Sequence, residues 1–552
     1  MAKLSFVGAA IAAALTGNAQ ASQPELVGSD LMGTRDPFAA NAVYFVVTDR
    51  FVDGDPANNF EQDSGWQLPV SLEGNSANVG YMGGDFKGIL NNADYIREMG
   101  FSAIWMTPIV ENPAEAFTGG DEIKPHGFAM DRGKAAYHGY WGTNFYKLDK
   151  HLPSAGLDFV QLNKQLADKG LSTVLDVVIN HGSPAYTMTD EQYRTSLFGK
   201  LYNEQGELVA DHGNLAPELL DTDKPLQAFF NTKRDLAQLA DMNTGKPEVM
   251  DYFVNAYLKW LGQGAGAMRI DTVKHVPAEH WGEFSRRIRA QYPGMFMFGE
   301  VYSFDPKEIG QYTFPDKGGM SVLDFPMKAA MDSVFAKGAD YSELQKALFL
   351  QPKNNPYANP YDLLTFYDNH DMPRMNASDE GFIDAHNWLF TARGIPVIYY
   401  GSEKGFERGK GEHMGNRNYF GQDNVDKAVS HPIRQALLPI ANLRAQLPSL
   451  QRGLQWDLGY DKDTAAFYRV VQNAEGYELA LVLLNKGDKS ASVELSAPLL
   501  AGEWQEPMGD NNLTVGKEAE LQVPAHGVRV LVRRGDKLPE QVSDKLAELS
   551  FY

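Results

Sequence analysis

Short apolar segments that end in polar residues recur along the chain, and they constrain the fold more than any other feature. They are VYFVVTDRF near 43, FSAIWMTP near 101, STVLDVVINH near 172, GAMRIDTVKH near 266, MFMFGEVY near 295, LLTFYDNHD near 363 and IPVIYYGSE near 395. Continuous apolar strands of this kind are typical of parallel sheets buried on both faces. Segments with apolar residues at helical spacing lie between them, at 159–170, 249–262 and 281–294. The chain therefore alternates strands with helices.

The spacing of the strand ends favours a barrel over an open sheet. Asp271 and Glu300 are 29 residues apart, as are Asp371 and Tyr400, which is about the length of one strand with its return helix. Polar residues stand at the strand carboxyl ends, where a barrel builds its active site. The rival, a doubly wound open sheet, would carry a glycine-rich phosphate-binding turn after its first strand, and the sequence has none there. We predict an α/β fold, a (β/α)8 TIM barrel.

Two departures from this spacing predict further structural units. Asp176 and Asp271 are 95 residues apart, too far for one strand and helix, and the excess is polar and irregular. Residues 111–137, rich in Gly and Pro, predict another loop at the barrel rim. Towards the C-terminus the pattern changes to short alternating strands separated by turn residues. The predicted units are the barrel in two parts (22–181 and 236–445), a small subdomain inserted after strand 3 (182–235) and a C-terminal antiparallel β-sandwich (446–552).

The first residues have the pattern of an export signal. An early lysine, an apolar run that begins at Leu4 and a small-residue pattern that ends at Ala21 are typical of a secretory signal peptide over residues 1–21. The apolar run is shorter than the roughly 20 residues that span a bilayer. We therefore expect an exported protein, periplasmic or extracellular, without a membrane anchor.

Composition narrows the classes of function. The 552 residues include no cysteine, which excludes thiol catalysis and cysteine-ligated zinc. The formal net charge is −21, so nucleic acid and anionic membrane surfaces would be repelled, and a neutral substrate suits the chain better. We also expect the chain to act as a monomer.

Three acids stand at the ends of predicted strands: Asp271 in MRIDTVKH, Glu300 in FGEVY and Asp371 in FYDNHD. Singly, each could cap a helix or form an ion pair. A barrel, however, delivers strand-end groups to one cavity, where two carboxyls can divide glycosidic cleavage between a nucleophile and a proton donor. Arg269 stands two residues before Asp271, so both side chains point to the same face, and its charge would keep Asp271 ionised.

Two histidines, His181 and His370, also lie at strand ends. They could donate hydrogen bonds to sugar hydroxyls, although a lone histidine is more often structural. The sequence has no HExxH motif or other close histidine spacing, which argues against a zinc site.

The loop DGDPANN, from Asp53 to Asn59, allows two interpretations. Asp, Gly, Pro and Asn are typical turn residues, and turn chemistry alone explains the composition. Asp53, Asp55, Asn58 and Asn59 also place four carboxylate or amide oxygens within seven residues, and calcium takes such ligands from flexible loops. The spacing is not that of an EF-hand. The local sequence leaves both interpretations open.

Four segments, in their order along the chain, resemble the signature regions of the α-amylase family of glycoside hydrolases: DVVINH (176–181), GAMRIDTVKH (266–275), FGEV (298–301) and FYDNHD (366–371). LADMN (239–243) resembles a further short region of that family. The resemblance implies a retaining enzyme in which Asp271 is the nucleophile, Glu300 the general acid and base, and Asp371 a residue that binds sugar hydroxyls and supports the transition state. It places other residues around the substrate: Arg269, His181, His370, Tyr140, His138, Lys274, His275 and Arg374. Tyr140 would stack beneath the attacked sugar, although core packing explains it equally well.

The loop DGDPANN, together with MGGDF (82–86), resembles the amino-terminal calcium site of bacterial cyclodextrin glucanotransferases and related amylases. The resemblance implies a Ca2+ ion bound by Asp53, Asp55, Asn58, Asn59, Gly83 and Asp85. A second family site, between the barrel and the insertion, would use Asn180 and the backbone of His275. There the usual acid is replaced by Gln238, although Asp235 lies nearby in the sequence.

We expect an enzyme that hydrolyses α-1,4-glucosidic bonds in starch, maltodextrins or related α-glucans through a covalent glycosyl-enzyme intermediate. A 4-α-glucanotransferase or cyclodextrin-active enzyme of the same family is the close alternative, because a sugar hydroxyl can intercept that intermediate in place of water. Transferases that cyclise glucans usually carry further C-terminal domains, and we expect this chain to lack them. A non-catalytic glucan-binding protein is an alternative of another class, but such relatives generally lose one of the acids, and all three are present here.

Overall fold

The computed structural model describes residues 30–125, 127, 130–509 and 511–552, and the expected signal peptide lies outside them. Its centre is an eight-stranded parallel sheet in which the strands follow one another as in the sequence. Leu323, just beyond the sixth strand, bridges in parallel to Leu364 in the seventh, which closes the sheet into the predicted barrel. The strands are β1 (Val43–Val46), β4 (Ala103–Met106), β7 (Ser172–Val177), β12 (Ala267–Ile270), β13 (Phe296–Gly299), β14 (Ser321–Val322), β15 (Leu364–Thr365) and β16 (Ile395–Tyr399).

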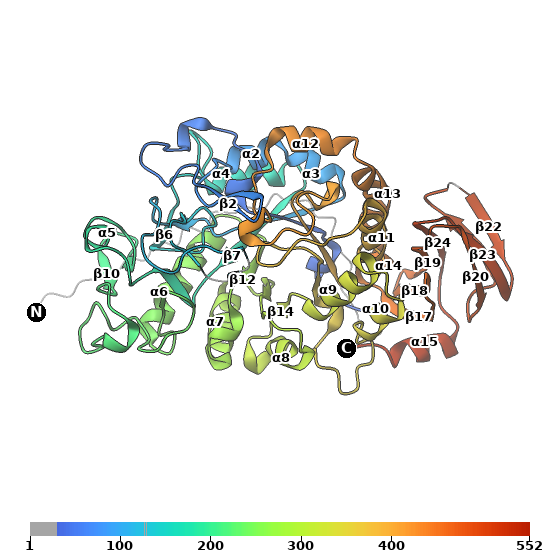
Figure 1. Ribbon diagram of the computed structural model, residues 1–552. Coiled ribbons are helices and arrows are strands. Elements are labelled where there is room, and N and C mark those ends of the chain that lie inside the picture. Colours follow the sequence, from blue (N-terminus) through green and yellow to red (C-terminus); the bar gives the residue numbers. More distant parts are fainter. Residues whose placement is uncertain (1–29, 126, 128–129, 510) are drawn as a thin grey trace, which may run out of the picture.

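Helices follow the strands and surround the barrel (Figure 1). They are α2 (Phe86–Asn91) and α3 (Ala93–Glu98) after β1, α4 (Phe159–Ala167) after β4, α6 (Pro247–Leu261) after β7, α7 (Ala278–Gln291) after β12, α8 (Pro306–Gly310) after β13, α9 (Phe325–Met331) and α10 (Ser342–Lys346) after β14, α11 (Asp379–Leu389) after β15, and α12 (Gly421–Val429) and α13 (Pro432–Gln446) after β16. Capping side chains fix several starts: Asp158 accepts from the Gln161 N–H in α4. Among the described residues, none of the helices is long and apolar enough to cross a membrane.

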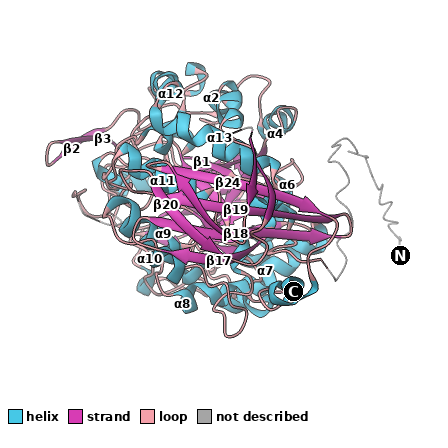
Figure 2. Cartoon of the chain, turned by 90° about the vertical axis from the view of Figure 1, so that its right-hand side faces the viewer, coloured by secondary structure: helices cyan, strands magenta, loops and turns pink. Residues whose placement is uncertain are grey.

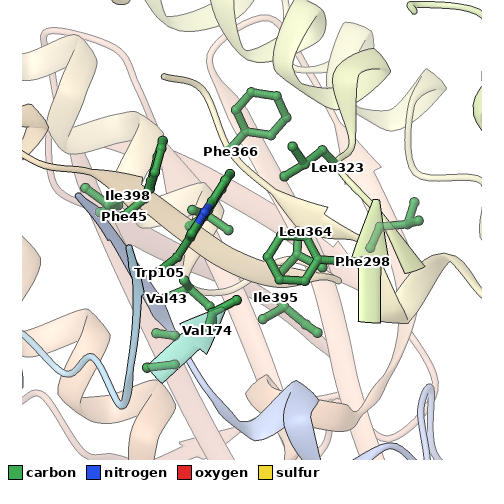
Figure 3. Packing of buried hydrophobic residues seen from close by; sticks show 14 of the residues in the cluster. Val43, Phe45, Trp105, Val174, Phe298, Leu323, Leu364, Phe366, Ile395 and Ile398 are labelled. Atoms are coloured by element: carbon green, nitrogen blue, oxygen red, sulfur yellow. The ribbon is translucent and has the colours of Figure 1, made fainter. Parts of the chain in front are cut away.

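Side chains at alternating strand positions fill the interior of the barrel. The buried residues labelled in Figure 3 include Val43, Phe45, Trp105, Val174, Phe298, Leu364 and Phe366. Successive residues of a strand point to opposite faces, so the side chain two positions further along points the same way. Asp176 stands two residues after Val174, and Glu300 two residues after Phe298. The apolar core therefore continues into polar groups at the carboxyl ends of the strands.

The chain leaves the barrel between β7 and α6 and forms the subdomain predicted after the third strand. Its two ends lie side by side, because β8 (His181–Pro184) pairs antiparallel with β11 (Leu239–Asp241). Between them lie α5 (Asp190–Thr195) and the hairpin of β9 (Lys200–Tyr202) and β10 (Leu208–Asp211). Rim segments before β7 add β2 (Pro69–Leu72) with β3 (Asn75–Asn78), and β5 (Val110–Glu111) with β6 (Asn144–Leu148).

The C-terminal residues form the predicted antiparallel sandwich, which Figure 2 shows in front of the barrel. One sheet has the order β17 (Leu454–Tyr460), β18 (Thr464–Asn473), β19 (Gly476–Asn485), β24 (Gly527–Gly535), β21 (Gly502–Glu506) and β22 (Asn511–Val515). The second sheet pairs β20 (Ala491–Ser496) with β23 (Glu518–Val523) and packs on β18, β19 and β24. Helices α14 (Pro448–Arg452) and α15 (Glu540–Ala547) flank the domain in sequence. Leu31 pairs with Gln472, so the first described residues are held against this domain.

Candidate active site

The three predicted acids converge at the carboxyl end of the barrel. Asp271 directly follows β12, Glu300 follows β13, and Asp371 lies in the loop after β15. Asp271 and Glu300 are each 5% exposed, and 24% of the Asp371 side chain is exposed. All three line one cavity of about 160 Å3. The rest of its wall consists of Lys134, His138, Tyr140, Trp141, His181, Leu236, Leu239, Thr272, Lys274, His275, Tyr302, His370, Glu412 and Arg417.

The fully buried guanidinium of Arg269 holds two of these acids together. Its Nη1 lies 2.7 Å from Asp271 Oδ1, and its Nη2 lies 2.6 Å from Glu300 Oε2. Nη1 also lies 2.8 Å from Oδ1 of Asp176, which stands beside Arg269 in the neighbouring strand β7. One cation therefore compensates three buried carboxyl groups and fixes Asp271 next to Glu300.

Asp176 belongs to the same group of charged side chains, although the sequence analysis assigned it no role in the site. Its Oδ2 accepts hydrogen bonds from Tyr140 Oη (2.7 Å) and from Trp105 Nε1 (2.9 Å). Burial raises the pKa of Asp176 to about 6, against the opposing effect of Arg269. The carboxyl thus orients both Arg269 and Tyr140 from below the cavity. The sequence does carry a signal for Asp176. It stands two residues after the buried Val174 in the same strand, so the two side chains point to the same face.

The environment of Glu300 favours its protonated form. Burial raises the pKa of Glu300 well above its ordinary value, Arg269 opposes this, and the charges of Asp371 and Asp271 raise the pKa further. Its Oε1 is buried and has no hydrogen-bond partner among the described residues. A buried carboxyl whose pKa is raised in this way, and whose second oxygen has no partner in the described residues, can act as a general acid.

Tyr140 lines the cavity together with three of the four predicted histidines, His138, His181 and His370. The ring of Tyr140 stacks on that of His370, with centroids 5.2 Å apart and planes at 8°. Burial lowers the pKa of His138, His181 and His370, so the imidazoles are neutral at pH 7. His138 Nε2, His181 Nδ1 and His370 Nδ1 are buried without a hydrogen-bond partner in the described part of the chain. These atoms are available to a polar, uncharged ligand.

Lys274 and His275 line the cavity as well, but Lys274 Nζ and His275 Nδ1 already have partners. Lys274 Nζ donates to the backbone oxygen of Tyr302 (2.7 Å), and His275 Nδ1 lies 2.8 Å from Asp235 Oδ1. Tyr302, which the sequence analysis did not single out, is 41% exposed and adds an aromatic ring to the wall.

Arg374, expected to line the substrate site, lies behind the cavity wall instead. It is 2% exposed, its Nε donates to Asn416 O (3.0 Å), and its Nη1 donates to Tyr400 O (2.9 Å). The guanidinium carbon lies 4.2 Å from the ring centre of Tyr399. These contacts tie the loop after β15 to Tyr399 at the end of β16 and to residues that follow this strand.

Three charged wall residues come from rim loops, where no sequence pattern indicated them. Arg417 Nη2 lies 2.6 Å from Asp371 Oδ1, and its Nη1 lies 2.9 Å from Glu412 Oε1. Lys134 Nζ lies 2.8 Å from the same oxygen of Glu412. Asp371 therefore has its own cationic partner, separate from Arg269.

Comparison with known proteins decides the family. A model of the α-amylase catalytic domain matches residues 45–446. The chain belongs to the α-amylase family. It is 30% identical to a cyclomaltodextrin glucanotransferase from Bacillus sp. (strain 17-1) over 518 residues, which cover 89% of this chain and 66% of that protein. The chain thus spans just under two thirds of the length of this curated relative.

Solved structures of the α-amylase family carry the same architecture. An α-amylase from Anoxybacillus superposes with a TM-score of 0.69 at 25% identity, covering 91% of this chain and 99% of that one. CldA, a cyclomaltodextrin glucanotransferase with three domains, superposes with a TM-score of 0.72 at 28% identity, covering 89% and 99%. This transferase has three domains, so the number of domains alone does not separate transferases from hydrolases.

In this α-amylase family enzyme, the predicted calcium loop gathers oxygens that lack partners. Asp53 Oδ1, Asn58 Oδ1 and Asn59 Oδ1 are buried and accept no hydrogen bond from the described residues. A methyl group at Gly83 would lie 2.5 Å from Asn59 Oδ1 and 2.9 Å from Asp53 Oδ2. The backbone at Gly83, with φ of +89°, therefore approaches these oxygens as closely as only glycine allows.

The other two predicted ligands behave differently from each other. Asp85 Oδ1 accepts from the backbone N–H of Gly88 (2.6 Å), and its Oδ2 accepts from Asn58 Nδ2 (3.0 Å), so it joins the loop to α2. The Asp55 side chain accepts from the Ala57 N–H and lies 3.8 Å from Lys87 Nζ. Turn chemistry thus explains the side chain of Asp55, and the unpartnered oxygens belong to its neighbours.

The second predicted metal position centres on Asp235. Its Oδ2 accepts from Asn180 Nδ2 (3.1 Å), and its Oδ1 faces His275, so it lies between the two predicted ligands. Within the described residues, no three or more His, Cys, Asp or Glu side chains are grouped to hold a metal ion. A cation at either position would therefore depend on amide and backbone oxygens as well as carboxylates.

Proposed function

We propose that this enzyme cleaves α-1,4-glucosidic bonds in starch, maltodextrins or related α-glucans with retention of configuration. The observation that carries the proposal is the pair Asp271 and Glu300, which share the Arg269 guanidinium at one cavity while Glu300 has a strongly raised pKa. A carboxylate and a protonated carboxyl side by side are the two groups that a retaining glycosidase requires.

In the first step of the proposed reaction, Asp271 attacks the anomeric carbon and forms a covalent ester with the sugar. Glu300 gives its proton to the glycosidic oxygen, so the leaving sugar departs as an alcohol. Glu300, now ionised, then takes a proton from a water molecule, whose oxygen attacks the anomeric carbon and releases Asp271. Arg269 stays charged throughout and orients both carboxyls.

The remaining wall residues would bind the sugar around these two acids. The Tyr140 ring, backed by His370, offers a flat apolar face to the sugar's C–H groups. The neutral histidines and Asp371 offer hydrogen-bond partners to hydroxyl groups. A negative charge on Asp371 also favours the positively charged transition state of this reaction.

Replacing Glu300 tests the proposal directly. We expect Glu300→Gln to lower kcat on maltoheptaose by about 100- to 10,000-fold, the range that general acid catalysis contributes. Glu308→Gln is the matched control, because this exposed glutamate lies in the following helix α8, and within the described part of the chain its side chain accepts a hydrogen bond from Ser303 alone. Equal turnover by wild type and Glu300→Gln would instead support a non-catalytic glucan-binding protein.

Transfer to a sugar hydroxyl is the second candidate, because the relatives compared above include cyclomaltodextrin glucanotransferases. Both reactions share the covalent intermediate and differ in what attacks it. Chromatography of the products from maltoheptaose separates them. Mostly shorter oligosaccharides would favour hydrolysis, whereas longer or cyclic products would favour transfer.

We further propose that Asp53, Asn58, Asn59, Gly83 and Asp85 hold a Ca2+ ion. Buried oxygens without hydrogen-bond partners support this, because such groups are costly unless a ligand satisfies them. The ion would hold the loop of residues 53–59 against α2. A second ion near Asp235 would use Asn180 and the backbone of His275.

The amino-terminal pattern supports export as a proposal of its own. We expect the mature protein in the periplasm or medium to begin after Ala21 and to migrate as a monomer in size-exclusion chromatography. Mass spectrometry of the exported chain checks the cleavage point. An intact Met1 on exported protein would contradict it.

A further inference from the structure

Side chains of the loop after β16 donate hydrogen bonds to the loop that carries Asp371. Asn416 Nδ2 donates to the backbone oxygens of Asn369 (2.9 Å) and Met372. Arg417 Nε donates to the backbone oxygen of His370 (2.8 Å). Three carbonyls around Asp371 are therefore fixed by two adjacent side chains of another loop.

The guanidinium of Arg417 also contacts the carboxylate of Asp371. Its Nη2 lies 2.6 Å from Asp371, and its Nη1 lies 2.9 Å from Glu412. Glu412 in turn faces Lys134 (2.8 Å), which lies 3.2 Å from Asp131. Charges alternate along this series, from Asp131 through Lys134, Glu412 and Arg417 to Asp371. The Arg417 and Lys134 side chains are each 6% exposed, so solvent screens the series weakly.

We propose that Arg417 is a positioning residue for Asp371. Glu412 holds Arg417 in place and limits how strongly Arg417 stabilises the negative charge of Asp371. The inference rests on the proposed function, in which Asp371 supports the transition state. Arg417 would act through Asp371 and not on the reacting atoms.

The geometry explains why an arginine is needed. Asp371 is the least buried of the three acids, and its only other charged contact among the described ion pairs is His370, at 3.3 Å. Burial lowers the pKa of His370 well below its ordinary value, so this ring brings no positive charge at pH 7. Arg417 reaches two carboxylates and one carbonyl with three different nitrogens, and a lysine has no such fork.

The same series predicts how Asp371 responds to pH. The charged or titratable groups that face Asp371 are Arg417, Glu412, Arg269, Lys134, His370, Glu300, Tyr140 and Tyr302. Burial raises the pKa of Asp371, Arg417 lowers it and Glu412 raises it. Removing Arg417 therefore raises the pKa of Asp371, and removing the charge of Glu412 lowers it. The two substitutions should move the acidic limb of kcat/KM in opposite directions.

Four variants test the inference. We expect Arg417→Gln to lower kcat by about 100-fold, as for a catalytic group misplaced by about 1 Å, and Arg417→Lys to recover part of the loss. The acidic limb should move up by about one pH unit in Arg417→Gln and down in Glu412→Gln, the scale of a nearby charge. Arg408→Gln is the control, because Arg408 lies in the same loop but pairs with Asp379 at 34% exposure. Its kcat and pH profile should match wild type.

Melting temperatures accompany each variant to separate loss of fold from loss of position. Glu412→Gln keeps Arg417 itself and an amide oxygen that can still accept from it, and removes only the negative charge, so its downward shift tests the inference even where Arg417→Gln unfolds. Acidic limbs that stay fixed, or move in the same direction in both variants, overturn it. The proposed function fails separately, through an active Glu300→Gln enzyme, whereas an inactive Glu300→Gln beside an unaffected Arg417→Gln overturns the positioning role alone.

Discussion

The cavity at the barrel mouth and the loop of residues 53–59 are both rich in oxygens, but they satisfy them differently. At the mouth, Arg269 and Arg417 supply permanent cations to the carboxylates. In the loop, Asp53 Oδ1, Asn58 Oδ1 and Asn59 Oδ1 are buried without a hydrogen-bond partner among the described residues. The chain thus supplies the countercharge at the mouth itself, whereas at the loop a cation from solution is our proposal.

The roles proposed for the two regions would account for this difference. Carboxyls that react need a fixed environment whose charge does not depend on solution conditions, and a buried arginine stays protonated at any physiological pH. Oxygens that only join loops can take a cation from solution, because an ion that binds the folded state stabilises it by mass action. Three measurements test the comparison.

The largest effect is expected at the mouth. Arg269→Leu leaves Asp176, Asp271 and Glu300 buried without their shared cation, and breaking a buried ion pair typically costs 3–5 kcal/mol. We expect the free energy of unfolding to fall by about that amount in urea titrations. Arg287→Leu is the control, because its pair with Asp251 is partly exposed and should contribute less than about 1 kcal/mol. A variant as stable as wild type would remove the distinction between the two regions.

The second effect belongs to the loop. A chelator should lower the melting temperature of the wild-type protein, because an ion at 100 times its Kd adds about 2.7 kcal/mol of stability. Asp53→Ala should lose most of this response, whereas Asp63→Ala, an exposed aspartate close by, should keep it. An identical chelator response in Asp53→Ala and wild type would exclude calcium from this loop.

The smallest effect is a shift in pH dependence that only the mouth should show. Burial and the charges of Asp371 and Asp271 raise the pKa of Glu300, so kcat/KM should fall on the alkaline side only well above the ordinary glutamate pKa. In Asp371→Asn, the alkaline limb of the residual activity should lie about one pH unit lower, because removing this negative charge lowers the pKa of Glu300. Because Glu300 and the acids beside it affect each other's protonation, the pH of this limb describes these groups together and not Glu300 alone.

Chelator sharpens this last test. It should change the melting temperature without moving the alkaline limb, because the groups around Glu300 are compensated by the chain itself. A limb that moves on chelation would mean that the two regions are coupled.

The barrel and the convergence of its strand-end acids could be predicted, because both depend on local sequence pattern. Each strand is a short apolar run, and the acid follows it at a fixed distance, so parallel pairing alone brings Asp271 and Glu300 to one rim. The same reasoning extends to Asp176, which lies on the inner face of β7 opposite Arg269.

The residues that pattern could not reveal lie on long rim loops. Lys134, Glu412 and Arg417 come from irregular segments far apart in the sequence, and only tertiary packing brings them together. Arg374 shows the opposite error, since its place in a recognised motif did not say that its side chain turns inward to backbone oxygens. Motif position indicates where the backbone runs and leaves the direction of a long side chain open.

The antiparallel pairing of β8 with β11 brings together the two ends of the subdomain inserted after the third strand. The chain leaves the barrel through β8, which begins at His181, and returns through β11, which pairs with it. The register of the barrel strands therefore does not depend on the length of the segment between β8 and β11. Leu236 and Leu239, on the returning arm, reach the cavity wall. Segments of other lengths could be spliced in here to reshape the substrate groove while the reacting groups stay where they are.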